Sequence, residues 1–226
     1  MKILDLFCGA GGASMGYHRA GFELVGVDMA PQPEYPFEFR QADVMELRLD
    51  VDFLKSFDAI HASPPCQAYT ALQKGTNARL GRKYPNLMGP VLYGLGQSRR
   101  PSVIENPAAR PDVVLCGTTL GLSVIRHRRF ELNEWTMAQP KHVKHAGTNR
   151  GWRHGVYRDG VWPDGRVVVE AYGNGGGKAS VAEMQTAMDM PWVSTRHGLT
   201  EAIPPAFTEC IGRDLLAHLT RAAVTA

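Results

Sequence analysis

The sequence predicts an α/β fold with a doubly wound, mostly parallel sheet, and three observations lead to this prediction. Short apolar, strand-like segments recur along the first part of the chain, at 2–7, 22–28, 58–63, 101–105 and 125–132. A glycine-rich turn joins the first of them to a helical pattern at 13–20, which Gly21 ends. Further helical stretches, including 87–98, fall between the later strands. Strands that alternate with helices indicate a parallel sheet with helices on both faces.

The composition and the periodicity of the sequence change after residue 132. Residues 133–180 are rich in Gly, His, Arg and Trp and show little periodicity, which predicts a small irregular region with long loops that are functional or mobile. Helical patterning returns in 181–226, where Pro204-Pro205 offers a helix entry and apolar residues recur every fourth position, at Phe207, Ile211, Leu215 and Leu219. We therefore divide the chain into 1–132, 133–180 and 181–226.

Composition narrows the class of protein. With 226 residues, 44% hydrophobic and 21% charged, the chain fits a globular domain with a small appendage and excludes a disordered protein. No apolar run approaches the roughly 18 residues of a membrane span, and the start of the chain does not resemble a signal peptide. The four cysteines have neither a CxxC pair nor zinc-site spacing, at Cys8, Cys66, Cys116 and Cys210. We expect free thiols, a cytoplasmic location, no metal and no membrane partner.

Charge is distributed unevenly although the net charge is only +3. Residues 59–104 contain no acidic residue and six basic ones, Lys74, Arg79, Arg82, Lys83, Arg99 and Arg100. An acid-free basic stretch favours a polyanionic partner. An ordinary solvated basic face is the alternative interpretation.

The glycine-rich turn DLFCGAGG at 5–12 is the first candidate site. Glycines let the backbone bend tightly and let a ligand approach it. Asp28 ends the second strand-like segment, where an acid can hold both hydroxyls of a ribose or simply cap the next turn. Asp43 follows a possible third strand and could accept a hydrogen bond from an adenine amino group. The turn lacks a phosphate-loop lysine, so a nucleoside is favoured over a nucleotide.

Cys66 follows the strand at 58–63 in the sequence SPPCQ. The two prolines restrict the backbone and place the thiol at the carboxyl end of a strand, where open sheets bind ligands. A thiol held there suits a nucleophile, whereas an isolated cysteine is more often an inert core residue.

Glu105 and the pair Arg126 and Arg128 complete the candidate chemistry. Glu105 ends the strand at 101–105, and a carboxyl group in a dry pocket can stay protonated and donate a hydrogen bond. Arg126 and Arg128 lie on one face of a strand-like run and could order a pocket or hold an anion. The alternatives are a solvated acid at a loop start and a solvated strand face.

These motifs, in this order, resemble the cytosine carbon-5 DNA methyltransferases. The matching residues are DLFCGAGG, Asp28, Asp43, PPCQ, Glu105-Asn106, Arg126 with Arg128, and IPPAFTECIG at 203–212. The resemblance implies a class I methyltransferase, Rossmann-like fold that binds S-adenosylmethionine or a derivative of it. The cofactor residues implied are Phe7, Gly9, Gly11, Gly12, Asp28, Met29, Asp43 and Pro65.

The resemblance also implies roles for the remaining residues. Cys66 would attack carbon 6 of a cytosine flipped out of double-stranded DNA, Glu105 would bond its ring nitrogen 3 and amine, and Arg128 its carbonyl, with Arg126 as support. Basic side chains of a mobile loop would contact phosphates, namely Lys74, Arg79, Arg82 and Lys83. The first segment would be catalytic and 133–180 a small target-recognition region, with Gly173 to Lys178 as a hinge. We expect a monomer in a prokaryotic or phage-infected cytoplasm.

Three positions depart from the family pattern. Val124 stands where glutamine is usual, Glu201 where asparagine is usual and Pro107 where valine is usual. The short 133–180 region implies a short target or a partner. The departures leave open an RNA acceptor, as in the tRNA-acting branch, or a carboxylated donor that delivers a carboxymethyl group. A non-catalytic DNA-binding subunit is a further alternative, against which Cys66 and Glu105 argue.

Overall fold

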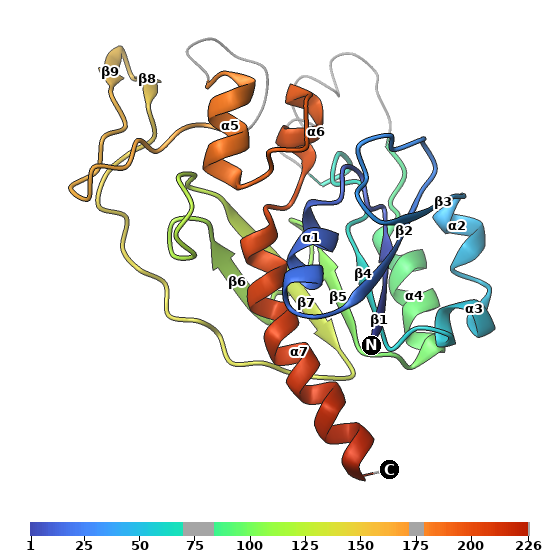
Figure 1. Ribbon diagram of the computed structural model, residues 1–226. Helices are drawn as coiled ribbons and strands as arrows, with labels where there is room; N and C mark the ends of the chain where they lie inside the picture. Colours follow the sequence, from blue (N-terminus) through green and yellow to red (C-terminus); the bar gives the residue numbers. More distant parts are fainter. Residues whose placement is uncertain (70–83, 172–178, 226) are drawn as a thin grey trace.

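A mixed seven-stranded sheet forms the centre of the computed structural model, which describes residues 1–69, 84–171 and 179–225 (Figure 1). The strand order is β3-β2-β1-β4-β5-β7-β6. The five strands from β3 to β5 run parallel, and β7 runs antiparallel to both β5 and β6. The strands are β1 Lys2–Leu6, β2 Glu23–Asp28, β3 Glu38–Gln41, β4 Ala59–Ala62, β5 Ser102–Glu105, β6 Val113–Cys116 and β7 His127–Asn133. The predicted α/β class and mostly parallel sheet are confirmed.

Helices cover both faces of the sheet, as the alternation of elements predicted. They are α1 Gly12–Arg19, α2 Val44–Leu47, α3 Val51–Lys55, α4 Met88–Ser98, α5 Val181–Met188, α6 Arg196–Glu201 and α7 Pro205–Thr225. Side chains alternate along a strand, so Ile3 joins the core under α1 and α7 while Leu4 joins a second core under α2, α3 and α4. The sheet is therefore doubly wound.

Glycines bring α1 and α7 into close contact (Figure 1). A Cβ atom on Gly16 would lie 2.1 Å from Oγ1 of Thr208, and one on Gly212 would lie 2.8 Å from Cβ of Ala20. The buried side chains of Phe207 and Ile211 complete the contact. The first and last helices of the chain thus form one layer over the sheet.

Residues 134–171 lie outside the seven strands of the sheet, and the structure describes the chain again from Ala179, just before α5. An extended stretch leads to a hairpin of β8 Gly151–Arg153 and β9 Val156–Arg158, which projects from the body of the molecule near α5 (Figure 1). The capping box of Ser180 with Glu183 begins α5. Among the described residues, no helix is both long and apolar enough to cross a membrane.

Two features differ from the sequence-based element assignment. The strand expected at 125–132 begins at His127, because the Arg126 carbonyl accepts a hydrogen bond from Gly117 N in the turn before it. The strand β6 was not anticipated, since its four residues VVLC carry no alternation of polar and apolar side chains.

Candidate active site

The turn after β1 is shaped by backbone in the left-handed region. Phe7, Gly9 and Gly11 have φ values of 62°, 49° and 80°, and positive φ is readily adopted by glycine. Oδ2 of Asp28 accepts a hydrogen bond of 3.1 Å from Gly9 N, and Oδ1 accepts one of 3.1 Å from Ala30 N. The turn-capping role of Asp28 that the sequence left open is therefore present, and its ribose-binding role stays a prediction.

Open space lies beside one glycine of this turn and not beside the other two. A Cβ atom on Gly9 would meet nothing within 4 Å, whereas on Gly11 it would lie 2.7 Å from Pro36 and on Gly12 2.2 Å from the carbonyl oxygen of Ile203. The backbone of Gly9 thus faces open space, while Gly11 and Gly12 permit close packing. A ligand can therefore approach this turn at Gly9, beside the Asp28 carboxylate.

The other predicted cofactor residues lie along the same edge of the sheet. Met29 follows β2 and is 69% exposed, and its carbonyl accepts a hydrogen bond from Gln41 at the end of β3. Asp43 is exposed and caps α2 by accepting a 2.7 Å hydrogen bond from Met45 N. Pro65 is exposed after β4. No contact among them requires a ligand, so their cofactor roles stay predictions.

Cys66 lies just beyond β4, and its side chain is neither fully buried nor fully exposed. Burial raises the pKa of the Cys66 thiol, and the carboxylates of Glu201 and Glu105 raise it further, while the Arg128 guanidinium opposes them. These charges act on the sulfur because the turns after β4, β5 and α6 converge. The inert-core interpretation of Cys66 does not fit this environment.

The segment before Cys66 is held from two sides. Pro64 O accepts a 2.9 Å hydrogen bond from the buried Asn106 side chain. Ser63 Oγ lies 2.7 Å from Nε2 of His61, a ring that burial keeps neutral by lowering its pKa to about 3. The backbone that carries the thiol is therefore fixed by β4 and by the turn after β5.

Glu105 and Arg128 form an ion pair beside Cys66. Nη1 of Arg128 lies 3.1 Å from Oε1 of Glu105, and the two side chains are 15% and 8% exposed, respectively. The antiparallel pairing of β5 with β7 brings them together. Nη2 of Arg128 donates to Ala202 O at 3.2 Å, so the pair also contacts the segment after α6. Neither residue is a solvated surface charge.

Arg126 is buried and contacts backbone rather than a carboxylate. Its guanidinium donates to the carbonyls of Ala171, Leu199 and Thr200, the last at 2.7 Å. These bonds connect the start of β7 to α6, so Arg126 positions the segment that carries Glu201. Val124, a departure from the family pattern, is buried and forms a β-bridge with Val169, where an apolar side chain suits its surroundings.

The structure does not test every predicted site residue. Those expected to contact phosphates fall outside the described residues, namely Lys74, Arg79, Arg82 and Lys83, and so does the expected hinge from Gly173 to Lys178. Sequence reasoning missed Trp192, whose Nε1 donates to Ala10 O at 2.9 Å and covers the glycine turn. A single tryptophan in a loop carries no signal for such a contact.

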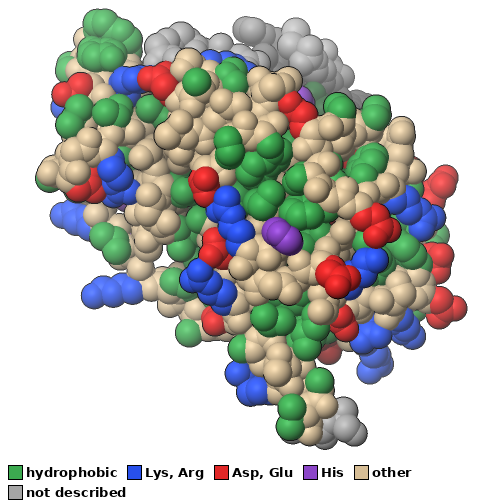
Figure 2. All heavy atoms as spheres, in the orientation of Figure 1, with side chains coloured by type: hydrophobic (Ala, Val, Ile, Leu, Met, Phe, Trp, Pro, Cys, Tyr) green, Lys and Arg blue, Asp and Glu red, His purple; other side chains and the backbone are tan. Residues whose placement is uncertain are grey.

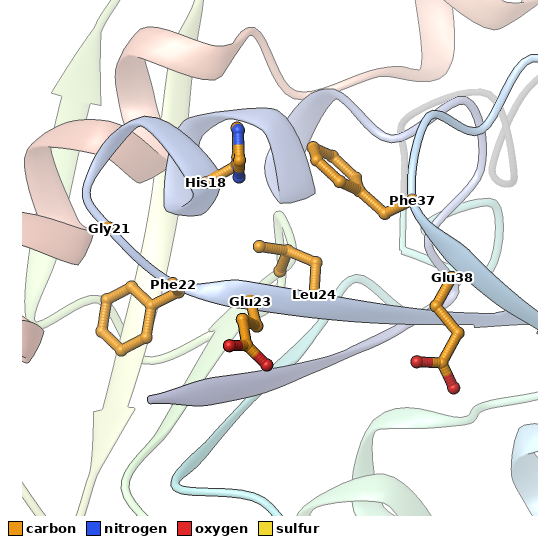
Figure 3. Close-up of a pocket in the computed structure, with 7 residues that line it drawn as sticks. All are labelled: His18, Gly21, Phe22, Glu23, Leu24, Phe37 and Glu38. Carbon is orange, nitrogen blue, oxygen red and sulfur yellow. The ribbon is translucent and has the colours of Figure 1, made fainter.

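A hollow of about 450 Å³ lies elsewhere, at the amino end of β2 (Figure 3). His18, Leu24 and Phe37 gather on the α1 side of the strand, while the carboxylates of Glu23 and Glu38 point to the other side. The hollow contains none of the predicted site residues. Ligands of open parallel sheets bind at the carboxyl ends of the strands, so this hollow is not the candidate site.

Comparison with known sequences points to one family. Residues 1–88 match the family described as C-5 cytosine-specific DNA methylase. Type II methyltransferase M.AplI of Arthrospira platensis is 35% identical over 80 residues, which is 33% of this chain and 23% of that protein. Type II methyltransferase M.HgiGI of Herpetosiphon aurantiacus is 31% identical over 83 residues, 33% of this chain and 66% of that protein. The matches therefore span less than two thirds of these relatives.

Comparison with solved structures supports the fold. A mutant DNMT2 of Spodoptera frugiperda matches with a TM-score of 0.61 and 13% identity over 95% of this chain and 99% of that chain. The Dnmt2 methyltransferase of S. pombe matches with a TM-score of 0.59 and 15% identity over 97% and 99% of the two chains. At these identities the likeness concerns the fold alone, a Rossmann-like α/β fold.

Proposed function

The chain belongs to the C-5 cytosine-specific DNA methylase family, and from this premise we propose that it methylates carbon 5 of cytosine in double-stranded DNA. One observation carries the proposal: a 2.9 Å hydrogen bond from the Asn106 side chain to Pro64 O joins the turn of the half-buried Cys66 to the strand end where Glu105 pairs with Arg128. A thiol with a carboxyl group and a guanidinium beside it is the set of groups that addition to a pyrimidine ring requires.

The proposed reaction begins with the Cys66 thiolate adding to carbon 6 of a flipped cytosine. The addition moves electron density to carbon 5, and Glu105 stabilises the ring through nitrogen 3 and the amine. Arg128 donates to the ring carbonyl and orients Glu105. Carbon 5 would take the methyl group as the bond from methyl to the donor's sulfonium breaks and S-adenosylhomocysteine leaves. A base would then remove the proton from carbon 5, and the bond from carbon 6 to sulfur would break to release the Cys66 thiolate.

The glycine turn is the proposed site for S-adenosylmethionine. When bound, this cofactor supplies an electrophilic methyl group on a sulfonium. Gly9 offers open space beside its backbone, and Asp28 offers a carboxylate to the ribose hydroxyls. In this proposal the cofactor also contacts residues along the same edge of the sheet, namely Phe7, Met29, Asp43 and Pro65. No metal takes part in the proposed transfer.

We propose unmodified S-adenosylmethionine as the donor. Among the described residues, the Glu201 carboxylate adds a negative charge near Cys66, which would repel the second carboxylate of a carboxylated sulfonium.

The β8–β9 hairpin is the proposed contact with DNA outside the active site. Trp152 and Tyr157 are 68% and 51% exposed and meet edge to face with ring centroids 5.7 Å apart. Figure 2 shows hydrophobic side chains on this projection, with charged ones beside them. Arg158 is exposed on β9. Exposed aromatic rings with a cation suit stacking on bases and contact with phosphates.

A product assay tests the proposal. Chain and S-adenosylmethionine are incubated with duplex DNA of mixed sequence or with tRNA, and the nucleosides are weighed by mass spectrometry. We expect one added methyl group on deoxycytidine, full loss of product for Cys66→Ser, and retained product for the matched control Cys210→Ser. Product on tRNA alone would show that the acceptor is RNA. A carboxymethyl group on the nucleoside, formed with the carboxylated donor, would show that the donor is carboxylated. Full turnover by Cys66→Ser would show that Cys66 is not the nucleophile.

A trapping experiment tests the covalent step separately. In duplex DNA that contains 5-fluorocytosine, the proton that must leave carbon 5 is replaced by fluorine, which cannot leave as a cation. We expect a DNA–protein adduct that survives denaturation and maps to Cys66. Product formation without any trapped adduct would contradict covalent catalysis.

DNA binding by the hairpin is tested with Trp152→Ala and Arg158→Ala. We expect both to weaken binding, and Arg158→Ala to reduce the slope of log affinity against log salt by about 0.9, the value for one lost phosphate contact. Arg213→Ala, a cation on α7 paired with Glu209, is the control. An unchanged affinity for DNA in both hairpin variants would show that the hairpin does not contact DNA.

A further inference from the structure

Four metal-ligating side chains converge at one place outside the candidate active site. We call Cys116, His127, His142 and His145 the Cys/His cluster, and their ligand atoms all lie within 4.8 Å of one another. Cys116 is buried, His145 is half-buried, and the other two are exposed. The cluster contains no carboxylate, so no ion pair accounts for the meeting of three imidazoles.

The sheet and the segment that follows it bring the cluster together. Antiparallel pairing of β6 with β7 places Cys116 directly opposite His127. The sequence HVKH at 142–145 then passes over this pair, and Val143 N between its two histidines donates to Oγ1 of Thr119 at 3.2 Å. Two ligands thus come from a rigid sheet edge, and two come from a segment hydrogen-bonded to the adjacent turn.

Two of the distances are close to those between neighbouring ligands of a tetrahedral zinc ion. Sγ of Cys116 lies 3.3 Å from Nε2 of His145, and Nε2 of His127 lies 3.1 Å from Nε2 of His142. Bond lengths of about 2.3 Å to sulfur and about 2.0 Å to nitrogen separate neighbouring tetrahedral ligands by roughly 3.3–3.6 Å. Thiolate and imidazole are ligand types that zinc prefers.

We propose that the Cys/His cluster binds one Zn²⁺ ion in a closed structural site. Four protein ligands fill the tetrahedral shell and leave no position for a substrate, which is the arrangement of structural rather than catalytic zinc. This inference is independent of the proposed methyl transfer and concerns a different part of the chain.

The ion would fix the path of the chain toward the β8–β9 hairpin. The rings of His145 and Trp162 have centroids 6.2 Å apart, and Nε1 of Trp162 donates to Thr148 O at 3.2 Å. Gly147 packs against the same indole, since a Cβ atom there would lie 2.9 Å from it. The zinc ion would therefore anchor residues 142–148 to β6 and β7 and so hold the base of the hairpin.

Metal content of the purified full chain tests the proposal. After incubation with Zn²⁺ and removal of loosely held metal by gel filtration, we expect one zinc per chain by elemental mass spectrometry. His142→Ala, at an exposed position where misfolding is not expected, should lower the zinc content at least tenfold, and so should Cys116→Ser. The matched controls His197→Ala and Cys210→Ser should keep one zinc. Absence of bound zinc in the unaltered chain, or equal content in His142→Ala, would overturn the site.

Cobalt substitution provides a readout that does not depend on activity. We expect the Co²⁺-loaded chain to show the intense visible absorption of tetrahedral cobalt and a thiolate charge-transfer band, and Cys116→Ser to lose that band. Cys66→Ser should keep both signals, which separates this site from the proposed active site. Only the weak absorption of octahedral cobalt would contradict a closed tetrahedral shell.

Discussion

The buried side-chain amide of Asn106 donates a 2.9 Å hydrogen bond to the carbonyl of Pro64 and so joins the two turns that carry Glu105 and Cys66. The other amide atom, Oδ1, accepts from Ala108 N at 3.0 Å. The side chain of Asn106 therefore sets the spacing between the Cys66 thiol and the Glu105 carboxyl group.

Asn106→Ala should loosen this connection. Because it leaves the Pro64 carbonyl and Ala108 N without their partner, we expect the free energy of unfolding to fall by about 1–3 kcal/mol. Methyl transfer should fall more than S-adenosylmethionine binding does, since the two turns move apart. Denaturant unfolding and single-turnover kinetics measure the two effects. Asn133→Ala, at the far end of β7, is the control, and equal behaviour of the two variants would show that the bond does not set the spacing.

Glu105→Gln should keep the shape of the site and weaken its stabilisation of the cytosine ring. The glutamine oxygen still accepts from Arg128, but the carboxyl group that faces ring nitrogen 3 and the amine is lost. We expect single-turnover methyl transfer to fall by about 10²–10³, the usual loss for one group that stabilises developing charge, with cofactor affinity preserved in calorimetry. Glu131→Gln, whose carboxylate accepts from Arg110 N outside the site, should remain active. Full activity of Glu105→Gln would exclude this role.

Glu201→Gln should make Cys66 ionise at lower pH. Burial raises the pKa of the Cys66 thiol, and the Glu201 carboxylate raises it further, so removing that charge favours the thiolate. The rate of iodoacetamide alkylation at Cys66, followed by peptide mass spectrometry across pH, reports thiolate directly. We expect the profile to move to lower pH for Glu201→Gln and to higher pH for Arg128→Met.

Glu46→Gln on α2 is the control for the alkylation profile, because its exposed carboxylate lies on another part of the molecule. A profile for Glu201→Gln that coincides with this control would show that the carboxylate does not act on the thiol.

Asp5 should make stability depend on pH. Burial raises its pKa to about 7, partly opposed by the hydrogen bond from Ser14. Between about pH 4 and pH 7 the folded chain keeps a proton on Asp5 that the unfolded chain has released, so stability falls as pH rises, by at most about 1.4 kcal/mol per unit. Urea unfolding from pH 5 to pH 8 should show this decline, reduced in Asp5→Asn and retained in the exposed control Asp52→Asn. Parallel curves for Asp5→Asn and the unaltered chain would refute the shift.

The motifs at strand ends could be predicted from the sequence because local signals define them. The positive φ of Gly9 and Gly11 favours glycine, so the turn at 9–12 could be recognised from the sequence. Prolines before Cys66 and after Asn106 mark the two turns that face each other. The carboxyl ends of neighbouring parallel strands meet at one edge, so order along the chain was enough to place Cys66 near Glu105.

Contacts that depend on register and on long connections could not be predicted. Cys116 and His127 meet only because β6 pairs antiparallel with β7 in one particular register, and no spacing rule for zinc includes that pairing. The contact of Arg126 with Thr200 joins residues 74 positions apart. The effect of the Glu201 carboxylate on the pKa of Cys66 likewise depends on where α6 ends. The sequence alone showed only that position 201 departs from the family pattern.

The close fit of α1 against α7 makes the glycine turn depend on a helix from the other end of the chain. Gly12 at the head of the glycine turn packs onto Ile203, and Gly16 packs onto Thr208. Removal of α7 would therefore uncover the packed face of α1 and take away the support of the proposed methyl-donor cleft. We expect a variant that lacks α7 to lose cofactor binding together with its cooperative unfolding.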